Sequence, residues 1–317
     1  MNCVLTRRRF LTRTAIAGLG ATAVSFSQRL SGTEPGHAKT GRALFDGKTL
    51  KGWRAVPRLY VPKDDRFANI PPEELKAAVV KWHEEHRQQD KLKHVGRWEV
   101  VDGAIVGGHE PPESLHGAYL LSEEKFADFE LELDARPDWP ADTGIMVRAH
   151  ELGSVGFQVL VDHRPKGCIG GVYGNSLGSF LVAPFAMTGD KLPGFRVENL
   201  RSVQPEGNFS AVTPTYGASF EDFLKAWRVN DWNRFRIRCV GRLPVITTWI
   251  NGTRICELDT AKIQAKGYDA EAVARLLGRA GHIAFEVHDV SLKNPLGYDR
   301  WGVGAVCRWR NISITEL

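Results

Sequence analysis

The chain has 317 residues, with 42 lysines and arginines, 37 aspartates and glutamates, and a formal net charge of +5. Four arginines and no acids lie in residues 1–23, so the net charge falls from +5 to +1 without this segment. A nearly neutral chain lacks the basic field that nucleic acid or an anionic membrane would need. The remaining residues suffice for one large all-β domain or two smaller domains.

The N-terminus has the pattern of a twin-arginine export signal. Residues 6–11 read Thr-Arg-Arg-Arg-Phe-Leu, and a weakly apolar, glycine-containing stretch follows over 14–24. This stretch is too short to span a bilayer comfortably, and Ala-Thr-Ala at 21–23 fits a cleavage site. We therefore expect a periplasmic or extracellular protein; a disordered basic N-terminus is the alternative. The expected parts are a signal peptide over 1–23, a linker over 24–41 and a domain over 42–317.

Four cysteines remain after the signal: Cys168, Cys239, Cys256 and Cys307. They are widely spaced and none belongs to a Cys-x-x-Cys pair, so a zinc site built from thiolates is not expected. An exported protein can form disulfides, and buried free thiols are an equally good interpretation.

One clear helix is predicted over 71–89. It begins with Pro-Pro-Glu-Glu, which is typical of a helix N-terminus. Leu75, Val79, Trp82 and His86 follow at spacings of four, three and four, which places them on one face. We expect this face to pack against the core, and the helix to be an insertion between two β segments.

From residue 97 the chain is predicted to form mostly short strands, with Asp-Gly at 102–103 and Asn-Gly at 251–252 as hairpin turns. A helical stretch over 270–277 and long loops over 180–230 interrupt them. Many short strands separated by turn residues predict an all-β protein, either a two-sheet β-sandwich or a jelly roll. The predicted strands are 98–106, 129–136, 144–149, 156–162, 234–239, 245–250, 282–288 and 306–314.

Nine short segments carry a family resemblance. They are Leu-Phe-Asp-Gly-Lys-Thr-Leu-Lys-Gly-Trp at 44–53, Trp-Glu-Val-Val-Asp-Gly-Ala-Ile at 98–105, and segments at 126–131, 142–148, 156–162, 232–233, 251–252, 281–288 and 310–312. In this order they resemble the 3-keto-disaccharide hydrolase domain family over residues 42–317. Each segment alone is weak, but nine in one order are hard to obtain by chance.

The resemblance implies a concanavalin-like jelly-roll β-sandwich with the helix over 71–89 inserted and with long loops. It also implies an enzyme that cleaves glycosides whose glucose unit carries a ketone at C3, so the expected partner is an oxidised carbohydrate. The sequence has Asp142 where the family usually has Asn, Gln158 where it has Glu and Leu160 where it has Gln. No nucleic-acid partner is expected, and no membrane partner after signal removal.

A ketone at C3 makes the hydrogen on C2 acidic. Removal of that proton gives an enolate, which expels the aglycone from C1, and water then adds to the unsaturated sugar. The site needs a base for the C2 proton and a positive centre for the enolate oxygen. A divalent metal could supply that centre, and the sequence leaves its identity open.

We expect Arg148, Asp162 and His288 to be the catalytic residues. Arg148 lies four residues after Gly144, where the missing side chain leaves room for a ligand, so it is a candidate for contact with the enolate or the sugar. Asp162 could be a base or a metal ligand, and His288, two residues after Glu286, could be either as well. The alternatives are a surface ion pair, a turn-capping aspartate and a structural histidine.

Strand alternation predicts where some of these side chains point. Gln158 and Asp162 are four residues apart, which places them on one face of a strand, and we expect Arg148 on that face too. The expected substrate-binding residues are Glu130, Asp134, Asp142, Gln158 and Tyr173.

Two alternative functions stay open. Glu130, Glu132 and Asp134 alternate along one strand, with neighbours about 6.5 Å apart, near the carboxyl separation of about 5–5.5 Å in retaining glycosidases. A classical two-carboxylate glycosidase is therefore one alternative, although alternating acids are usually a solvated face. A non-catalytic carbohydrate-binding module of the same fold is the other.

Overall fold

The computed structural model describes residues 41–63, 65–67, 70–138, 141–162, 166–189, 199–203, 210–291 and 300–317. All of these belong to one compact unit, Lys39–Leu317. The predicted signal peptide and nearly all of the predicted linker lie outside the described residues. Within the described part of the chain, no helix is long and apolar enough to cross a membrane.

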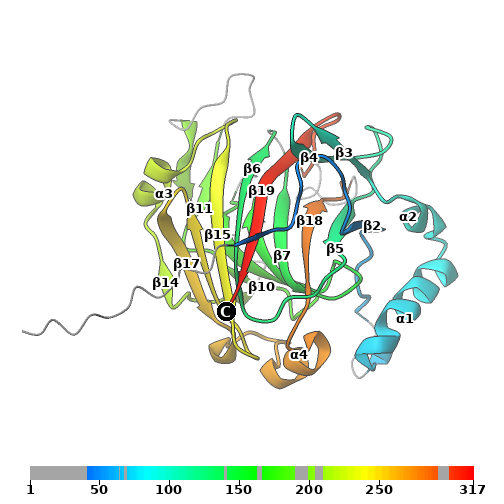
Figure 1. Ribbon diagram of the computed structural model, residues 1–317. Helices are drawn as coiled ribbons and strands as arrows, with labels where there is room; N and C mark the ends of the chain where they lie inside the picture. The colour runs from blue at the N-terminus through cyan, green and yellow to red at the C-terminus, as the bar shows by residue number, and fades with distance from the viewer. Residues whose placement is uncertain are drawn as a thin grey trace, which may run out of the picture. The chain divides into compact units, whose positions relative to one another are not determined.

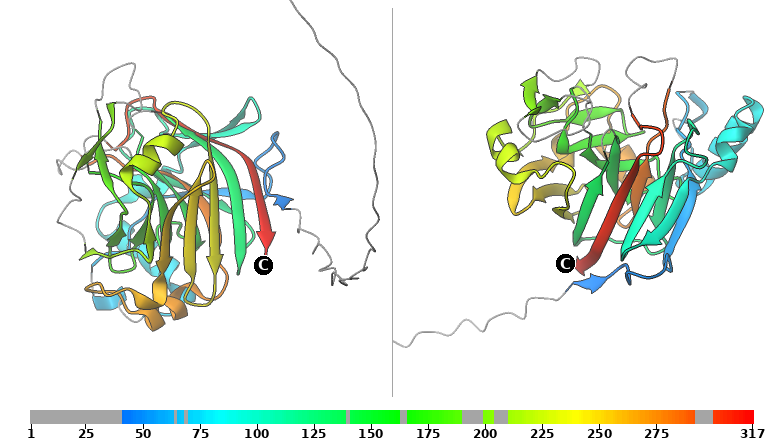
Figure 2. Two further views of the ribbon diagram at one scale, coloured as in Figure 1. Left: turned by 90° about the vertical axis from the view of Figure 1, so that its left-hand side faces the viewer. Right: turned by 90° about the horizontal axis from the view of Figure 1, so that it is seen from above.

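Two large sheets form the fold (Figure 1). Sheet A has nine strands. Its strands, from one edge to the other, are β14 (Tyr216–Gly217), β17 (Thr253–Asp259), β16 (Val245–Ile250), β15 (Asn233–Val240), β6 (Phe129–Pro137), β19 (Val306–Glu316), β4 (Ala104–Gly108) and β3 (Arg97–Val101), with β1 (Arg42–Ala43) paired to β19. In Figure 2 the C-terminal strand β19, in red, lies beside β6.

Sheet B has eight strands. Their order is β13 (Ser210–Ala211), β10 (Phe180–Val182), β9 (Ile169–Asn175), β8 (Gly156–Val161), β7 (Thr143–Ala149), β18 (His282–Val287), β5 (Ala118–Ser122) and β2 (Trp53–Pro57). A small third sheet pairs β11 (Ala186–Thr188) with β12 (Arg201–Val203). Of the pairings described, only that of β10 with β13 is parallel.

The core lies between sheets A and B and follows from strand alternation. In β6 the side chains of Phe129, Leu131 and Leu133 are fully buried, while the residues between them are half-buried. Across the interface, Phe285 of sheet B stacks on Trp309 of sheet A, with ring centroids 4.8 Å apart. Each such buried side chain stabilises the fold by about 1.5–3 kcal/mol. Two antiparallel sheets packed face to face confirm the predicted all-β sandwich.

The predicted helix over 71–89 is two helices, α1 (Pro72–Glu85) and α2 (Gln89–Lys93). The chain turns between them at Arg87, whose φ is +55°. The buried side chains of α1 are Leu75, Val79 and His83, so the predicted packing of His86 is wrong. The helix ends at Glu85, so His86 is its exposed C-cap and no longer follows the helical spacing.

Two further helices are α3 (Phe220–Ala226) and α4 (Ala270–Leu277). The predicted helical stretch over 270–277 is confirmed. The segment 180–230, predicted as long loops, also holds α3 and several strands of two or three residues, which are too short to show periodicity in sequence. Figures 1 and 2 place α1 and α2 on the opposite side of the molecule from α3.

Sheet B is unlike sheet A because its central strands are buried on both faces. Every residue of β7, β8 and β18 is buried. A small apolar cluster that includes Tyr119, Met146 and Ala284 forms part of the face of sheet B that points away from sheet A. We call this the outer face of sheet B, and polar side chains gather on it beside that cluster.

Candidate active site

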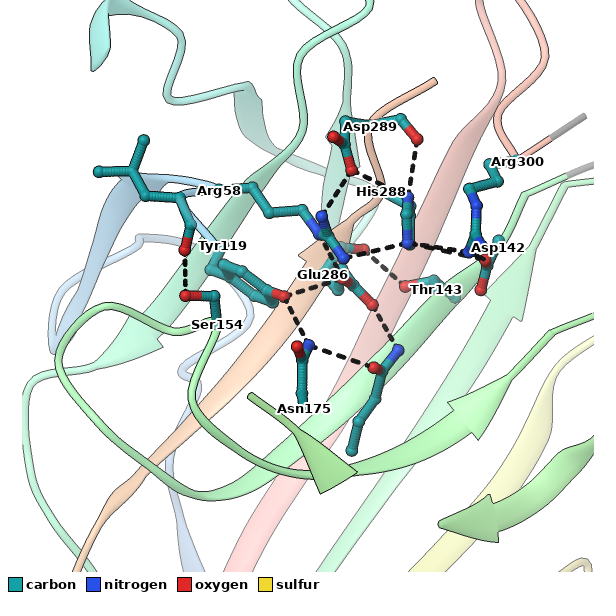
Figure 3. A network of polar contacts seen from close by, with 12 residues as sticks. Arg58, Tyr119, Asp142, Thr143, Ser154, Asn175, Glu286, His288, Asp289 and Arg300 are labelled. Carbon is teal, nitrogen blue, oxygen red and sulfur yellow. Dashed lines mark hydrogen bonds and ion pairs between the residues drawn. The ribbon is translucent and has the colours of Figure 1, made fainter. Parts of the chain in front are cut away.

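Strand alternation places polar side chains on the outer face of sheet B. Because Phe285 points between the sheets and stacks on Trp309, its neighbour Glu286 points to the outer face. Tyr119 of β5 points to the same face and donates a hydrogen bond to Glu286 (Figure 3). Gln158 of β8 also donates a hydrogen bond to Glu286. Three strands that are far apart in sequence thus build one polar network.

Glu286 is the buried centre of this network, with no exposed surface. Its Oε1 accepts hydrogen bonds from Arg58 Nε at 2.7 Å and from the Tyr119 hydroxyl at 2.9 Å, and its Oε2 accepts one from Gln158 Nε2. Burial alone would raise the pKa of Glu286. The charge of Arg58, together with the hydrogen bonds that Arg58 and Tyr119 donate, outweighs burial and lowers the pKa below its usual value. Glu286 is therefore a carboxylate at neutral pH.

His288, directly after β18, has its imidazole between two guanidinium groups. Arg58 Nη2 and Arg300 Nη1 each lie 3.0 Å from His288 Nε2. A guanidinium can only donate hydrogen bonds, so Nε2 is the acceptor and Nδ1 carries the proton. Nδ1 donates to the main-chain oxygen of Asp289 at 2.7 Å. The Nε2 lone pair of the imidazole thus faces the two arginines.

Asp142 anchors one of these arginines. The residue comes just before β7 and is 2 % exposed. Its Oδ2 accepts a hydrogen bond from Arg300 Nη1 at 2.7 Å and lies 3.9 Å from His288 Nε2. Its main-chain N–H also donates to the Arg300 carbonyl at 2.6 Å. The carboxylate therefore fixes the Arg300 guanidinium beside the imidazole.

Asp289 ties the other arginine to the imidazole. Its Oδ1 lies 2.5 Å from Arg58 Nη1 and 3.2 Å from His288 Nδ1, and its Oδ2 lies 3.2 Å from Lys91 Nζ. Burial would raise the pKa of Asp289, but Arg58, His288 and Lys91 together lower it well below its usual value. Asp289 is therefore ionised and joins three nitrogen-bearing side chains.

Tyr119 closes the inner end of the network. Burial raises the pKa of Tyr119 well above its usual value, so its hydroxyl keeps the proton that it donates to Glu286. The same hydroxyl accepts a hydrogen bond from Asn175 Nδ2 at 3.2 Å. Asn175 and Tyr173, two residues apart on β9, are both partly exposed and offer polar and aromatic contacts to a ligand.

A divalent metal does not fit this arrangement. Among the described residues, no group of three or more His, Cys, Asp or Glu side chains is placed to hold a metal ion. The acceptor nitrogen of His288 faces two cationic groups, Arg58 and Arg300, and a second cation there would be repelled by both. The positive centre at this site is the pair of guanidinium groups.

The structure brings together three of the residues predicted from sequence. His288 and Asp142 belong to the same network (Figure 3). Gln158 joins it through its hydrogen bond to Glu286, and Tyr173 pairs with Gln158 across β8 and β9. Asp162 is buried directly after β8, and its main-chain N–H donates to Cys168 O. Its role as base stays a prediction.

The predicted shared face of Arg148 and Gln158 is wrong. Arg148 has a φ of +51°, and the pairing of β7 with β18 shifts register beside it, so alternation is broken at this residue. Its Nη2 contacts Asp128 Oδ1 at 3.1 Å and Gly241 O at 3.0 Å. Both partners adjoin strands of sheet A, so the buried side chain of Arg148 points between the sheets.

Gly144 serves a different purpose from the one predicted. A Cβ atom at this position would lie 2.5 Å from Cγ of Gln158. The missing side chain therefore makes room for Gln158 itself, and not directly for a ligand.

Glu130 and Asp134 lie on the outward-facing side of β6, in sheet A, so the prediction that they bind substrate at this site is not met. Asp134 contacts Arg234 at 3.3 Å and Arg310 at 3.4 Å. Glu130 lies 3.8 Å from Arg238. This is the solvated face with ion pairs that alternating acids usually form. A two-carboxylate glycosidase built on this strand stays an untested alternative.

Cys168, Cys239, Cys256 and Cys307 are all buried free thiols. Burial raises the pKa of Cys168 to about 12, so this thiol is protonated at neutral pH and is not a nucleophile.

Sequence reasoning missed most of the cations of the site. Arg58, Lys91 and Arg300 come from segments between predicted elements, where periodicity gives no signal. Tyr119 lies within a short apolar run. Glu286 had a usable signal, since a residue two positions from His288 can share its face, but a buried carboxylate inside an apolar strand is unusual.

Comparison with known protein families gives one match. The 3-keto-alpha-glucoside-1,2-lyase-like domain matches residues 40–315 of this chain. A comparison with curated proteins gives no match.

Several solved structures are similar in fold. Two from Parabacteroides distasonis ATCC 8503 are provisionally assigned as glycosyl hydrolases. One is 16% identical, with a TM-score of 0.39, covering 84% of this chain and 99% of that one. The other is 12% identical, with a TM-score of 0.41, covering 86% and 92%. A carbohydrate-binding module, CBM66 from Bacillus subtilis, is 11% identical, with a TM-score of 0.37, covering 70% and 92%.

Proposed function

We propose, for a chain that belongs to the 3-keto-alpha-glucoside-1,2-lyase-like domain family, that it cleaves glycosides whose glucose unit carries a ketone at C3. The outer face of sheet B is the proposed active site. The single observation that carries the proposal is the imidazole of His288, whose Nε2 lies 3.0 Å from both Arg58 Nη2 and Arg300 Nη1.

That arrangement supplies the two functions that elimination needs. The C3 carbonyl oxygen of a bound substrate is a better acceptor for Arg58 and Arg300 than a shared imidazole nitrogen, because it becomes an enolate in the reaction. When the guanidinium groups turn to that oxygen, the lone pair of His288 Nε2 is released for the C2 proton. When the substrate oxygen replaces the imidazole nitrogen as the acceptor for the two arginines, the base and the oxyanion site thus become available together.

The proposed reaction has two steps. In the first, the C2–H bond breaks, the proton goes to His288 Nε2, and the electron pair is held on the C3 oxygen as an enolate. In the second, the enolate re-forms the ketone and a C1–C2 double bond, the C1–O bond breaks, and the aglycone oxygen leaves with a proton. The imidazolium is the proton source closest to hand.

Addition of water completes the proposed hydrolysis. Hydroxide adds at C1 and a proton at C2 of the unsaturated ketone, which gives the free 3-keto sugar. A lyase would instead release the unsaturated ketone. Analysis of the first product by NMR therefore distinguishes the two outcomes at this site.

The carboxylates have supporting roles in this proposal. Asp142 holds Arg300, and Glu286 holds Arg58 at Nε while leaving its Nη2 toward the imidazole. Because Glu286 has no exposed surface, it does not reach substrate in this arrangement. Its proposed role is to place Arg58.

A carbohydrate-binding module of the same fold is the second candidate. Tyr173 and Asn175, both partly exposed on β9, are the kind of residues that hold a sugar without chemistry. Titration with unoxidised and 3-keto glucosides by calorimetry, alongside product analysis, separates the candidates, since a module would bind sugar and release nothing.

The test of the proposal compares an α-glucoside with its 3-keto derivative as substrates of the purified protein. We expect cleavage of the keto form and no cleavage of the parent glucoside, because only the adjacent carbonyl acidifies C2. Equal turnover of both substrates would overturn the proposal.

A further inference from the structure

We propose that Lys91 is a positioning residue for His288 and acts through Asp289. The inference rests on the proposed function only where it takes His288 to be the base. It brings the α1–α2 insertion, which lies outside the two sheets, into the chemistry of the site.

The two carboxylate oxygens of Asp289 are held by cations from different segments. Arg58, just after β2, contacts Oδ1 at 2.5 Å, and Lys91, from α2, contacts Oδ2 at 3.2 Å. Oδ1 is also 3.2 Å from His288 Nδ1. The position and the charge of Asp289 beside the imidazole therefore depend on both cations.

Lys91 is itself held in place by the insertion. Its Nζ lies 5.0 Å from the centroid of the Tyr60 ring, a cation–π contact. The main-chain oxygen of Tyr60 accepts a hydrogen bond from His83 Nε2 at 3.1 Å, and His83 Nδ1 contacts Gln88 Oε1 at 2.8 Å. His83 is fully buried in α1. The burial of one face of α1 thus fixes Lys91 at the site.

The charges around His288 balance only when Lys91 is counted. Among the described residues, three carboxylates lie around the imidazole: one just before β7, one on β18 and one on the residue that follows His288. Three cations also lie there: one just after β2, one on α2 and one before β19. A further titratable neighbour is His109, after β4, whose Nε2 donates to the His288 carbonyl at 2.8 Å. The three carboxylates are Asp142, Glu286 and Asp289, and the three cations are Arg58, Lys91 and Arg300.

Loss of Lys91 would leave a net negative charge beside the imidazole. A negative neighbour favours the imidazolium, so His288 would gain its proton at higher pH. We expect Lys91→Met to move the midpoint of the His288 titration upward by about 0.5 to 1 pH unit. A base that stays protonated to higher pH also loses activity at the acidic side of its pH profile.

The experiment follows the His288 imidazole by ¹⁵N NMR as pH is varied, with the signal assigned from its loss in His288→Gln. Lys91→Met is compared with Lys91→Arg, which keeps the charge, and with Lys93→Met. Lys93 is a matched control on α2, because its side chain is 74% exposed and contacts only Asp90 among the ion pairs described. We expect the midpoint to move only in Lys91→Met, and Lys91→Arg to restore the original value.

An equal midpoint in Lys91→Met and Lys93→Met would overturn the proposal. If Lys91→Met does not fold, Lys91→Gln, which keeps the polar end of the side chain, replaces it under the same criterion. The readout needs no substrate, so it remains decisive if the protein does not cleave 3-keto-glucosides. In that event the proposed function fails, and the inference about Lys91 is still decided by the midpoint of the His288 titration.

Discussion

His288 owes its candidate role to its neighbours and not to its own sequence position. Its Nδ1–H donates a hydrogen bond to the Asp289 carbonyl, and its Nε2 lone pair faces two arginines. A histidine whose tautomer is fixed on one side and whose other nitrogen faces a cationic pair is arranged for proton transfer next to a developing oxyanion.

The first prediction concerns this residue. We expect His288→Gln to lower kcat on a 3-keto-glucoside by roughly 100-fold or more, because general base catalysis is lost while the two arginines still bind the carbonyl. His86→Gln, an exposed histidine on the insertion, is the control and should leave kcat unchanged. Steady-state kinetics decides it, and a His288→Gln variant within a few-fold of the unmodified protein would remove His288 from the role of base.

At the residue scale, sequence supplied part of the site for a clear reason. His288, Asp142 and Gln158 lie in or next to strands whose alternation and motifs can be recognised, and they do share one network. Arg58 and Arg300 lie in segments without periodicity, and only the pairing of distant strands brings them to the imidazole. Long-range pairing of this kind leaves no local pattern.

At the element scale, the hairpins and the helix break show what local rules can predict. The turn at 102–103 has positive φ at both residues, +50° and +74°, as expected for Asp-Gly between two strands. Arg87 and Arg148 also have positive φ, but an arginine gives no warning of it. The same unusual backbone therefore ended the predicted helix early and reversed the predicted direction of Arg148.

The second prediction tests the packing of β7 against β8. In Gly144→Ala the new methyl group would meet Gln158 Cγ at 2.5 Å, which forces Gln158 away from Glu286. We expect the free energy of unfolding to fall by about 1–3 kcal/mol and activity to fall with it. Denaturant titration measures the change.

The double variant Gly144→Ala/Gln158→Ala provides the control for this clash. If the clash is the cause, the second substitution should recover part of the loss, with a coupling energy of about 0.5–3 kcal/mol. Strictly additive effects would show that Gly144 is needed for some other reason.

At the scale of the whole molecule, the buried carboxylates make stability depend on pH. The pKa values of Glu286 and Asp289 in the folded protein lie below their usual values of 4.5 and 3.8. Stability from such groups is present above the unfolded pKa and is lost as pH falls through the folded pKa. We therefore expect the melting temperature to fall increasingly as pH drops below about 4.5.

Glu286→Gln gives this third prediction its test. The substitution should cost about 3 kcal/mol at pH 7, since it breaks a fully buried pair, and should also weaken the loss of stability at acid pH. Glu124→Gln is the control, because its ion pair with Arg42 is largely exposed and contributes little. Melting curves of Glu286→Gln and the unmodified protein that stay parallel down to pH 3 would contradict the assignment.

Location is the fourth prediction at this scale. We propose export by the twin-arginine route from the pattern at residues 6–11. Replacement of Arg7 and Arg8 by lysine should leave the folded protein in the cytoplasm. Cell fractionation with an antibody checks it, and unchanged export of the variant would rule out this route.

Removal of the C2 proton is the central claim, and deuterium exchange tests it most directly. The protein is given a 3-keto-α-glucoside in heavy water and the released 3-keto sugar is examined by ¹H NMR, with a control for uncatalysed exchange. We predict that the C2 signal is lost through deuterium incorporation during enzymatic cleavage, because elimination removes that hydrogen and hydration restores it from solvent. Release of a 3-keto sugar that keeps its C2 hydrogen would contradict elimination and leave direct displacement at C1 as the mechanism.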